Sequence, residues 1–289
     1  MQGHRRNDAF NGKARSDLLM VCFAGHSRIY EPRSSLSVME PDLPIVGLMN
    51  ERRKLLEGIR KHEPLLLLGP RGSGKTRIVR SAMRELPARN DIVYVEYSSN
   101  LHDLLIGLAR ALLASGHRTL RRLAATGSDA EKWFSHQTSV HLKGILWTAL
   151  ETEPRTLILD GVNGASHPIY RFLQRVYFAR GMAIFAVSRD VAALGALGRL
   201  FWDPRKILQF RPLTEPDARQ LFDVAADRFG LRKREVDLEE FREKVLEAAA
   251  GNPGQIVEMC RLAAQPQYVT GRYIKFAPLR IDALMRFMR

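Results

Sequence analysis

Cysteine is nearly absent from this chain of 289 residues, which contains only Cys22 and Cys260. Two cysteines cannot build a disulfide framework or, alone, a zinc site, so they indicate a reducing compartment. Long apolar runs are also missing, because no stretch approaches the roughly 20 residues that a membrane-spanning helix needs. The short apolar run Leu18–Ala24 follows basic residues but lacks a persuasive cleavage site. We therefore expect a cytoplasmic protein with no membrane partner.

Acidic residues are scarce relative to basic ones. The chain has 31 Asp and Glu against 45 Lys and Arg, a formal net charge of +14 and a pI near 10.2. Residues 171–211 hold eight basic side chains against two acidic ones, and residues 266–289 hold five against one. This balance favours polyanionic partners, above all DNA. The alternative is that the arginines only solvate the surface.

The most informative segment is Leu65–Thr76, with the sequence LLLLGPRGSGKT. It fits an apolar strand, the phosphate-binding loop G-x-x-x-x-G-K-[ST] and the start of a helix. Its glycines favour positive φ angles, so that backbone amides turn inward toward an anion. We expect Lys75 to reach the β- and γ-phosphates of ATP and Thr76 to bind Mg²⁺. The expected nucleotide-binding residues of this loop are Gly69, Pro70, Arg71, Gly72, Ser73, Gly74, Lys75 and Thr76.

Strand-like and helix-like segments alternate up to about residue 211, which implies parallel strands with right-handed crossovers. The expected strands are Leu65–Leu68, Asp91–Tyr97, Thr156–Asp160, Met182–Val187 and Ile207–Phe210. The expected helices are Asn50–Lys61, Lys75–Leu86, Leu101–Ala114, Thr138–Leu150, Pro168–Arg180, Glu215–Phe229, Leu238–Ala250 and Gly254–Ala264. The fold class is thus α/β: a P-loop NTPase with a parallel five-stranded sheet flanked by helices, followed by a small helical lid domain.

Composition and periodicity divide the chain into four parts. Residues 1–42 read as a weakly ordered arm, residues 43–212 as the α/β core, residues 213–265 as the helical lid and residues 266–289 as a basic tail. Within the core, Gly116–Gln137 is polar, basic and irregular, and we interpret it as an excursion. Its Trp133 and Phe134 either stack on nucleic-acid bases or, the interpretation we favour, pin the excursion to the core.

An apolar strand that ends in Asp160, about 85 residues after the P-loop, has the pattern of a Walker B strand. Asp160 would hold Mg²⁺ directly or through water. A carboxylate that only caps a loop is the alternative.

Together these segments resemble the AAA+ and STAND P-loop ATPases over about residues 44–264. The motifs that carry the resemblance are PIVG, GPRGSGKT, LILDG, VSR, RPLTEPDARQLF and EAAAGNPGQIVEMCRLA. The pairing of GPRGSGKT with VYVEYSSNLHDLLIGLARAL resembles the branch with origin-recognition proteins and transposon-encoded AAA+ regulators. The resemblance implies an adenine-side strap at Ile45 and Val46, a nucleotide contact at Pro253 and a γ-phosphate sensor at Arg189. It also implies an arginine finger at Arg199, with Arg205 as the alternative, although both could be surface arginines.

The sequence departs from the family pattern where water would be activated. Relatives usually carry Glu directly after the Walker B Asp, but Gly161 stands there. Glu96, which ends the second strand, could substitute as a catalytic residue, because that strand neighbours the P-loop strand in many such sheets. An exposed strand-end carboxylate is the equal alternative. Leu48 replaces the Arg that often follows the strap Gly, and Gly254-Gln255 stand where many lids carry an arginine.

Three functions fit these residues. The first is an ATP- and Mg²⁺-binding switch, slowly hydrolysing, that self-associates, docks on DNA, or does both, and recruits or regulates a separate effector protein. The second is a STAND-type signalling or defence module without nucleic acid. The third is a hydrolysis-deficient nucleotide-binding scaffold, because a missing water-activating base slows hydrolysis by about 10²–10⁴-fold.

Overall fold

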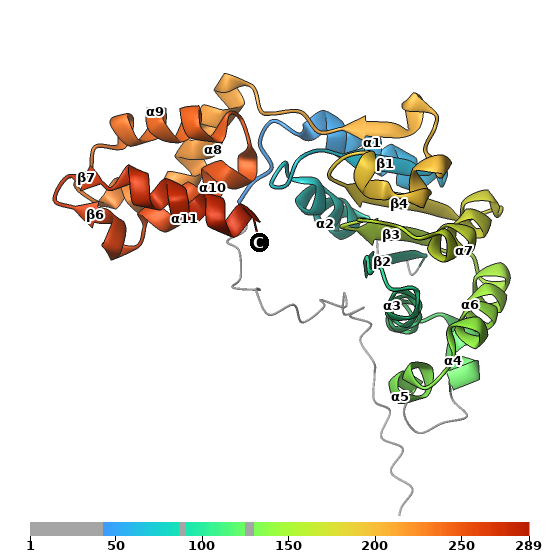
Figure 1. Cartoon of the computed structure of the whole chain (residues 1–289). Coiled ribbons are helices and arrows are strands. Elements are labelled where there is room, and N and C mark those ends of the chain that lie inside the picture. Colours follow the sequence, from blue (N-terminus) through green and yellow to red (C-terminus); the bar gives the residue numbers. More distant parts are fainter. Residues whose placement is uncertain (1–42, 87–90, 125–129, 289) are drawn as a thin grey trace, which may run out of the picture.

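The computed structural model describes residues 43–86, 91–124 and 130–288. An α/β core and the group of helices that follows it in the chain lie side by side (Figure 1). The expected arm, residues 1–42, lies outside the described residues. In the described part of the chain, no helix has the length and apolar character needed to cross a membrane.

The core contains one parallel sheet of five strands, as expected, in the order β2-β3-β4-β1-β5. The strands are β1 (Leu65–Leu68), β2 (Ile92–Glu96), β3 (Thr156–Asp160), β4 (Ala183–Ser188) and β5 (Ile207–Gln209). Because all five run in one direction, their carboxyl ends meet at one edge. In open α/β sheets this is the edge where ligands bind.

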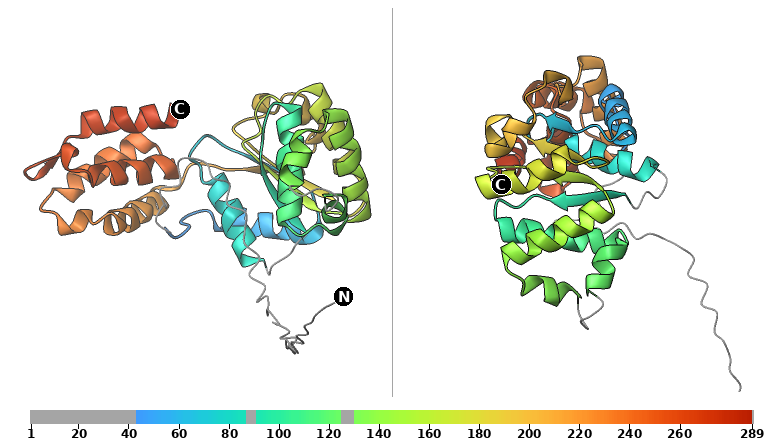
Figure 2. Two further views of the ribbon diagram at one scale, coloured as in Figure 1. Left: turned by 90° about the horizontal axis from the view of Figure 1, so that it is seen from below. Right: turned by 90° about the vertical axis from the view of Figure 1, so that its right-hand side faces the viewer.

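Helices cover both faces of the sheet (Figures 1 and 2). The core helices are α1 (Met49–Lys61), α2 (Lys75–Glu85), α3 (Leu101–Ala114), α4 (Arg118–Ala124), α5 (Ala130–Ser135), α6 (Ser139–Thr152) and α7 (His167–Phe178). Between β4 and β5 lie three short 3₁₀ turns: η1 (Ala192–Leu194), η2 (Ala196–Leu200) and η3 (Pro204–Lys206).

Alternating side chains of each strand supply two separate apolar cores. Leu67 of β1 packs on the face covered by α1 and α2, whereas Leu66 and Leu68 pack on the face covered by α3 to α7. The first core, which we call the lid-side core, continues without a break into the helices that follow β5. The second, the α3–α7 core, ends within the α/β part.

The helical part after the sheet is larger than the sequence indicated. It consists of α8 (Glu215–Arg228), η4 (Leu231–Lys233), α9 (Leu238–Ala249), α10 (Pro253–Ala263), η5 (Pro266–Tyr268), strands β6 (Val269–Thr270) and β7 (Tyr273–Ile274), and α11 (Phe276–Met288). Where we expected only a basic tail, β6 and β7 form an antiparallel pair. Helix α11 packs on α10 and buries Leu279 and Ala283. The domain boundaries themselves stay a prediction.

The excursion at residues 116–137 is not irregular, which corrects our interpretation. It contains α4 and α5, and residues 125–129 lie outside the described part. The arginines that made the segment look polar, Arg118, Arg121 and Arg122, lie on α4, which buries Leu120, and α5 buries Phe134. Phe134 meets Trp133 edge-on, with 4.9 Å between the ring centroids. The two aromatics therefore attach α5 to the α3–α7 core, as the favoured interpretation required.

Candidate nucleotide-binding site

The P-loop joins β1 to α2 at the carboxyl edge of the sheet. Gly72 and Gly74 have φ angles of +82° and +91°, as the motif requires. Our expectation of a positive φ at Gly69 is wrong. Gly69 is needed for space instead, because a Cβ there would lie 2.8 Å from both Phe210 Cβ and Ser73 Oγ. The loop therefore has the backbone shape of an anion site at the N-terminus of α2.

Lys75 turns back onto its own loop. Its amine donates to the carbonyl oxygens of Gly69 at 2.5 Å and Pro70 at 2.8 Å, and to Ser73 Oγ at 3.1 Å. Burial lowers the pKa of Lys75 to about 8, against the opposing effect of Asp160. A phosphate would offer this amine a charged partner in place of neutral carbonyls, and would favour its protonated form.

Asp160 ends β3 beside the P-loop helix. Thr76 Oγ1 donates to Asp160 Oδ1 at 3.1 Å, and the Tyr94 hydroxyl donates to Asp160 Oδ2 at 2.6 Å. Burial, followed by the charge of Asp160, raises the pKa of Tyr94, so its hydroxyl keeps its proton and donates. The carboxylate is thus oriented by one side chain from α2 and one from β2.

Glu96 lies beside Asp160, but not for the reason we expected. Strand β2 is the edge strand next to β3, separated from β1 by β3 and β4, so our assumption that β2 neighbours the P-loop strand is wrong here. The Cα atoms of Glu96 and Asp160 are register partners, and paired residues project to the same face. Glu96 is exposed at that position. Its carboxylate is therefore available at the end of the strand that adjoins Asp160.

Gly161, the residue in place of the usual Glu, has a φ of +77°. A Cβ there would have no atom within 4 Å, so space does not exclude a side chain. The backbone conformation disfavours one, because an L-residue in the left-handed region is strained. The loop after β3 is thus shaped for glycine.

The start of α10 contacts the P-loop directly. Gly254 N–H donates to the Gly72 carbonyl oxygen at 2.8 Å, and Asn252 Nδ2 donates to the Arg71 carbonyl oxygen at 2.8 Å. Arg71 Nη1 donates to the carbonyl oxygen of Phe287, near the end of α11, at 2.9 Å. A Cβ at Gly72 would lie 2.5 Å from Phe287 Cε1, so only glycine permits this approach. Pro253, half-buried, is the first residue of α10 and lies between these contacts.

The strap before α1 lies between the P-loop and the base of the lid. Val46 is buried and Ile45 half-buried, both against the lid-side core. A Cβ at Gly47 would lie 2.7 Å from Leu213 Cδ2, and one at Gly74 would lie 2.8 Å from Leu48 Cδ1. Leu48, which replaces the expected arginine, therefore packs on the loop instead of offering it a charge.

The three candidate arginines are exposed. Arg189 follows β4 at the carboxyl edge, next to buried Ser188, whose Oγ donates to the Val162 carbonyl oxygen at 2.9 Å. Arg199 lies in η2, with its guanidinium 5.9 Å from the ring centroid of Tyr170 on α7. Arg205 pairs with Asp203, its Nη2 lying 3.0 Å from Asp203 Oδ2. These positions leave Arg189 and Arg199 accessible, and Arg205 is committed to a local ion pair.

The residues present fit a nucleotide with magnesium. The Thr76 hydroxyl and the Asp160 carboxylate, 3.1 Å apart, are hard oxygen donors of the kind Mg²⁺ takes. Within residues 43–86, 91–124 and 130–288 no group of three or more His, Cys, Asp or Glu could hold a metal. Mg²⁺ usually keeps several waters and binds substrate phosphates, so one or two protein ligands are enough for it.

Sequence reasoning missed three contributors to this edge: Tyr94, Asn252 and Phe287. Tyr94 could have been found, because it precedes Glu96 by two residues and so shares its face of β2. Asn252 stands in the glycine–proline motif as the N-cap of α10. Phe287 gave no signal, since nothing in the sequence placed α11 against the P-loop.

Comparison with known proteins agrees with this geometry. Residues 59–187, which include the P-loop and Asp160, match the AAA domain family. No curated protein matches the sequence.

Three solved structures are similar to this one. The Orc1 protein of Aeropyrum pernix in complex with DNA has a TM-score of 0.55 and 16% identity, covering 86% of this chain and 68% of that one. Cdc6p of Pyrobaculum aerophilum has a TM-score of 0.56 and 15% identity, covering 79% of this chain and 63% of that one. A Walker-type ATPase of Pyrococcus abyssi has a TM-score of 0.53 and 15% identity, covering 84% and 71%. At these identities the likeness establishes the fold. Residues 59–187 therefore match the AAA domain family, and the chain has a P-loop NTPase fold similar to that of the Orc1 and Cdc6p structures.

Proposed function

We propose that this chain is an ATP- and Mg²⁺-dependent switch that hydrolyses ATP slowly, self-associates and docks on DNA to regulate or recruit a separate effector protein. The observation that carries the proposal is the meeting of Lys75, Thr76 and Asp160 with the N-terminus of α10 at one edge of the sheet. A site built from both core and lid responds to whether a triphosphate is held. A ligand shifts a conformational equilibrium only through such differential contacts.

The nucleotide contacts follow from this geometry. Loop amides of residues 69–76 and the positive end of α2 would hold the phosphates, with Lys75 on the β- and γ-phosphates. Ile45, Val46 and Pro253 would line the remaining nucleotide, between strap and lid. Mg²⁺, held by Thr76 and Asp160, would neutralise phosphate charge. Arg189 would sense the γ-phosphate from the end of β4.

Glu96 is the proposed base for hydrolysis. It stands beside Asp160 on the same face, and Gly161 offers no carboxylate. Since Glu96 is exposed, water around it is poorly excluded, which supports slow turnover until a partner covers the site. A second copy of the chain could provide that cover together with Arg199, which stands outward on η2 and would act in trans.

DNA as a partner is supported by two observations. The chain carries a formal charge of +14, concentrated in residues 171–211 and 266–289. The Orc1 protein with the similar fold was solved bound to DNA.

A hydrolysis-deficient scaffold is the second candidate, favoured by the glycine-shaped loop at Gly161. A STAND-type signalling module without nucleic acid is the third, favoured by the absence of an arginine at Gly254-Gln255.

Three measurements on the whole chain separate these candidates. Steady-state ATP turnover with and without DNA distinguishes a slow enzyme from a scaffold, with Lys75→Ala as the blank. Sedimentation velocity with ATP·Mg²⁺, repeated with Arg199→Ala, tests assembly through the arginine. Affinity for DNA should fall steeply as salt rises, because phosphate contacts release counterions. Absent DNA binding at low salt, with intact nucleotide binding, would favour the STAND module.

A further inference from the structure

A second group of side chains lies away from the nucleotide edge, on α6, α7 and the η2–η3 segment. These elements cover the α3–α7 core, on the face of the sheet opposite to α1 and α2. Aromatic rings alternate there with basic side chains. We call it the α6–α7 surface and define it by Trp147, Arg171, Arg175, Tyr177, Phe178, Trp202 and Lys206.

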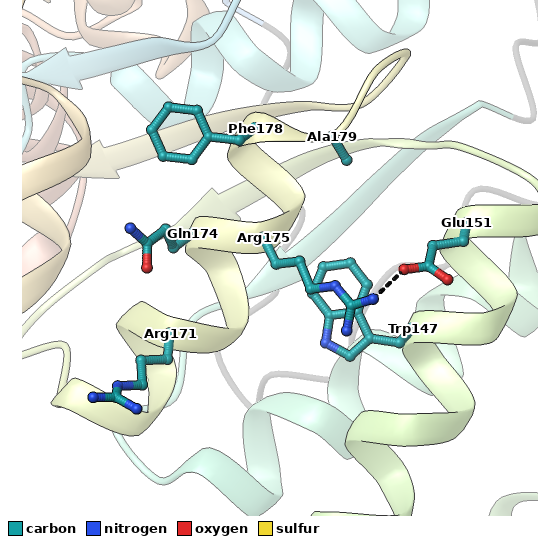
Figure 3. Close-up of a pocket in the computed structure, with 7 residues that line it drawn as sticks. All are labelled: Trp147, Glu151, Arg171, Gln174, Arg175, Phe178 and Ala179. Carbon is teal, nitrogen blue, oxygen red and sulfur yellow. Dashed lines mark hydrogen bonds and ion pairs between the residues drawn. The ribbon is translucent and has the colours of Figure 1, made fainter.

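One end of the surface is a shallow hollow of about 370 Å³ between α6 and α7 (Figure 3). The Arg175 guanidinium lies 4.3 Å from the ring centroid of Trp147, and its Nη2 is 2.5 Å from Glu151 Oε1. Arg171 lies one turn earlier on α7 and is exposed. The hollow is thus lined by a tryptophan ring that one guanidinium group covers, with a second guanidinium group one turn away.

The other end carries two rings that are unusually accessible. Phe178 is 71% exposed and Trp202 is 80% exposed. Tyr177 connects them, since its ring centroid is 5.1 Å from that of Phe178 and 5.6 Å from that of Phe201, the neighbour of Trp202. Lys206 Nζ lies 3.2 Å from the Tyr177 hydroxyl. Phe178, Tyr177 and Lys206 therefore lie together, and Trp202 follows in the chain the buried ring of Phe201 that Tyr177 contacts.

Charge selects the occupant of this surface. Glu151 is paired with Arg175 and Asp203 with Arg205, so these two carboxylates are neutralised and Arg171 and Lys206 leave the surface with an excess of positive charge. Exposed aromatic rings among basic side chains suit a nucleic-acid strand, which offers both phosphates and bases that can stack. In duplex DNA the bases are already stacked on one another, whereas a single strand leaves their faces open. A second copy of this basic chain would bring like charges together.

We propose that the α6–α7 surface binds single-stranded DNA, with Trp202 and Phe178 stacking on bases and Arg171 and Arg175 contacting phosphates. This rests on the proposed function and adds to it the form of DNA and the place where it binds. The proposed nucleotide-binding groups then lie beside the lid-side core, and the proposed DNA-binding surface lies on the opposite face of the sheet.

The test uses the whole chain and fluorescence anisotropy of a labelled mixed-sequence DNA strand of about 16 nucleotides, alone and as a duplex. Wild-type chain should prefer the single strand. Trp202→Ala and Phe178→Ala should each weaken single-strand affinity by about tenfold while leaving its salt dependence unchanged, because stacking releases no counterions. Trp202→Phe keeps a stacking ring and should retain most of the affinity.

Substituting the two arginines should instead change the salt dependence of single-strand binding. Arg171→Ala with Arg175→Ala should reduce the slope of log affinity against log salt by up to about 1.4, since each single-strand phosphate contributes about 0.7. The matched control, Arg60→Ala with Lys61→Ala, removes the same charge from exposed positions on α1 and should leave the slope nearly unchanged. Thermal unfolding verifies that each variant is folded.

Three results would overturn the proposal. They are wild-type single-strand affinity in Trp202→Ala and Phe178→Ala, equal binding of duplex and single strand, or a loss of self-association instead of DNA affinity in these variants. If the wild-type chain bound no DNA of either form, the DNA part of the proposed function would fail as well. If the wild-type chain bound DNA, and Trp202→Ala, Phe178→Ala and the Arg171→Ala, Arg175→Ala double variant all bound it equally well, only the α6–α7 surface would be wrong.

Discussion

The two faces of the sheet are built from the same strands but serve different ends. The lid-side core runs from the strap through α1, α2 and the sheet into α8–α11, and the groups proposed to hold phosphate and metal project beside it. The α3–α7 core is confined to the α/β part and buries equally large side chains, among them Phe134. Among the described residues, the lid-side core therefore connects the P-loop strand with α8–α11, and the α3–α7 core does not.

This contrast depends on how a strand alternates. In β2, Val93 and Val95 point into the α3–α7 core, whereas Tyr94 and Glu96 stand on the lid side with Asp160. Shifting the register by one residue would send the carboxylates to the wrong face. The same pattern therefore determines both the packing and the chemistry.

The largest expected effect falls on turnover. Glu96→Gln removes the proposed base on the lid side and should slow ATP hydrolysis by about 10²-fold or more without changing ATP affinity. Glu57→Gln, an exposed carboxylate on α1, is the matched control and should be silent. Phosphate release under saturating ATP measures both. If Glu96→Gln hydrolysed ATP as fast as wild type, Glu96 would be an ordinary strand-end carboxylate and not the base.

Stability should separate the two cores next. Phe134→Ala should lower the free energy of unfolding by about 3–5 kcal/mol and leave nucleotide affinity unchanged, because its core ends short of the site. Leu279→Ala should cost about 2–5 kcal/mol and also weaken nucleotide binding, because α11 supports α10 and reaches the P-loop. Urea unfolding and nucleotide titration provide the two readouts. Weakened nucleotide binding in a folded Phe134→Ala variant would contradict the difference drawn between the two cores.

The pH dependence of stability offers a finer test through His117, buried behind α3. Its Nε2 lies 3.1 Å from the Glu153 carbonyl oxygen, and its Nδ1 lies 3.3 Å from both the Leu120 nitrogen and Glu153 Oε2. Burial lowers the pKa of His117 against the opposing charge of Glu153. The unfolded chain therefore binds this proton first, and stability is lost as pH falls below about 6.5.

The expected slope from His117 is at most about 1.4 kcal/mol per pH unit. Unfolding in urea at pH values from about 7 down to 5 should show a smaller decline in His117→Gln than in wild type. Nucleotide affinity should not follow the same difference, since His117 belongs to the far face. An unchanged decline would mean that other groups cause the acid sensitivity.

The smallest effects come from two glycines with open surroundings. Gly161→Ala should destabilise the chain by about 1 kcal/mol, because its φ of +77° strains a side chain. Gly144 is an exposed position of α6, and a Cβ there would have no atom within 4 Å. Gly144→Ala should therefore stabilise the chain by about 0.5–1 kcal/mol through helix propensity. Thermal unfolding distinguishes the signs. If both substitutions changed the stability in the same direction, the backbone conformation at position 161 would not require glycine.

Much of the fold could be read from the sequence because local patterns specify it. LLLLGPRGSGKT contains its own strand, turn and helix start, and TLILD marks the buried β3, so the five-stranded sheet and the lid were predictable. Helices α4 and α5 were not, because both are short and their polar side chains mask the few apolar residues that they bury. The edge position of β2 was missed because strand order depends on tertiary pairing.

The candidate site divides in the same way. The loop residues and Asp160 follow from a motif, whereas the contacts of Tyr94, Asn252 and Phe287 join segments up to 216 residues apart. Local sequence periodicity does not predict contacts between residues so far apart in the chain. The roles assigned to Glu96, Arg189 and Arg199 concern chemistry that depends on nucleotide and on a second copy, and these stay proposals.

Isothermal titration calorimetry of the whole chain with ATP·Mg²⁺ tests the central claim most directly. The account predicts saturable binding to the wild-type protein, abolished in Lys75→Ala and preserved in Lys61→Ala, whose amine is exposed on α1. Folded wild-type chain that binds no ATP·Mg²⁺, or Lys75→Ala that binds it as tightly as wild type, would contradict the site.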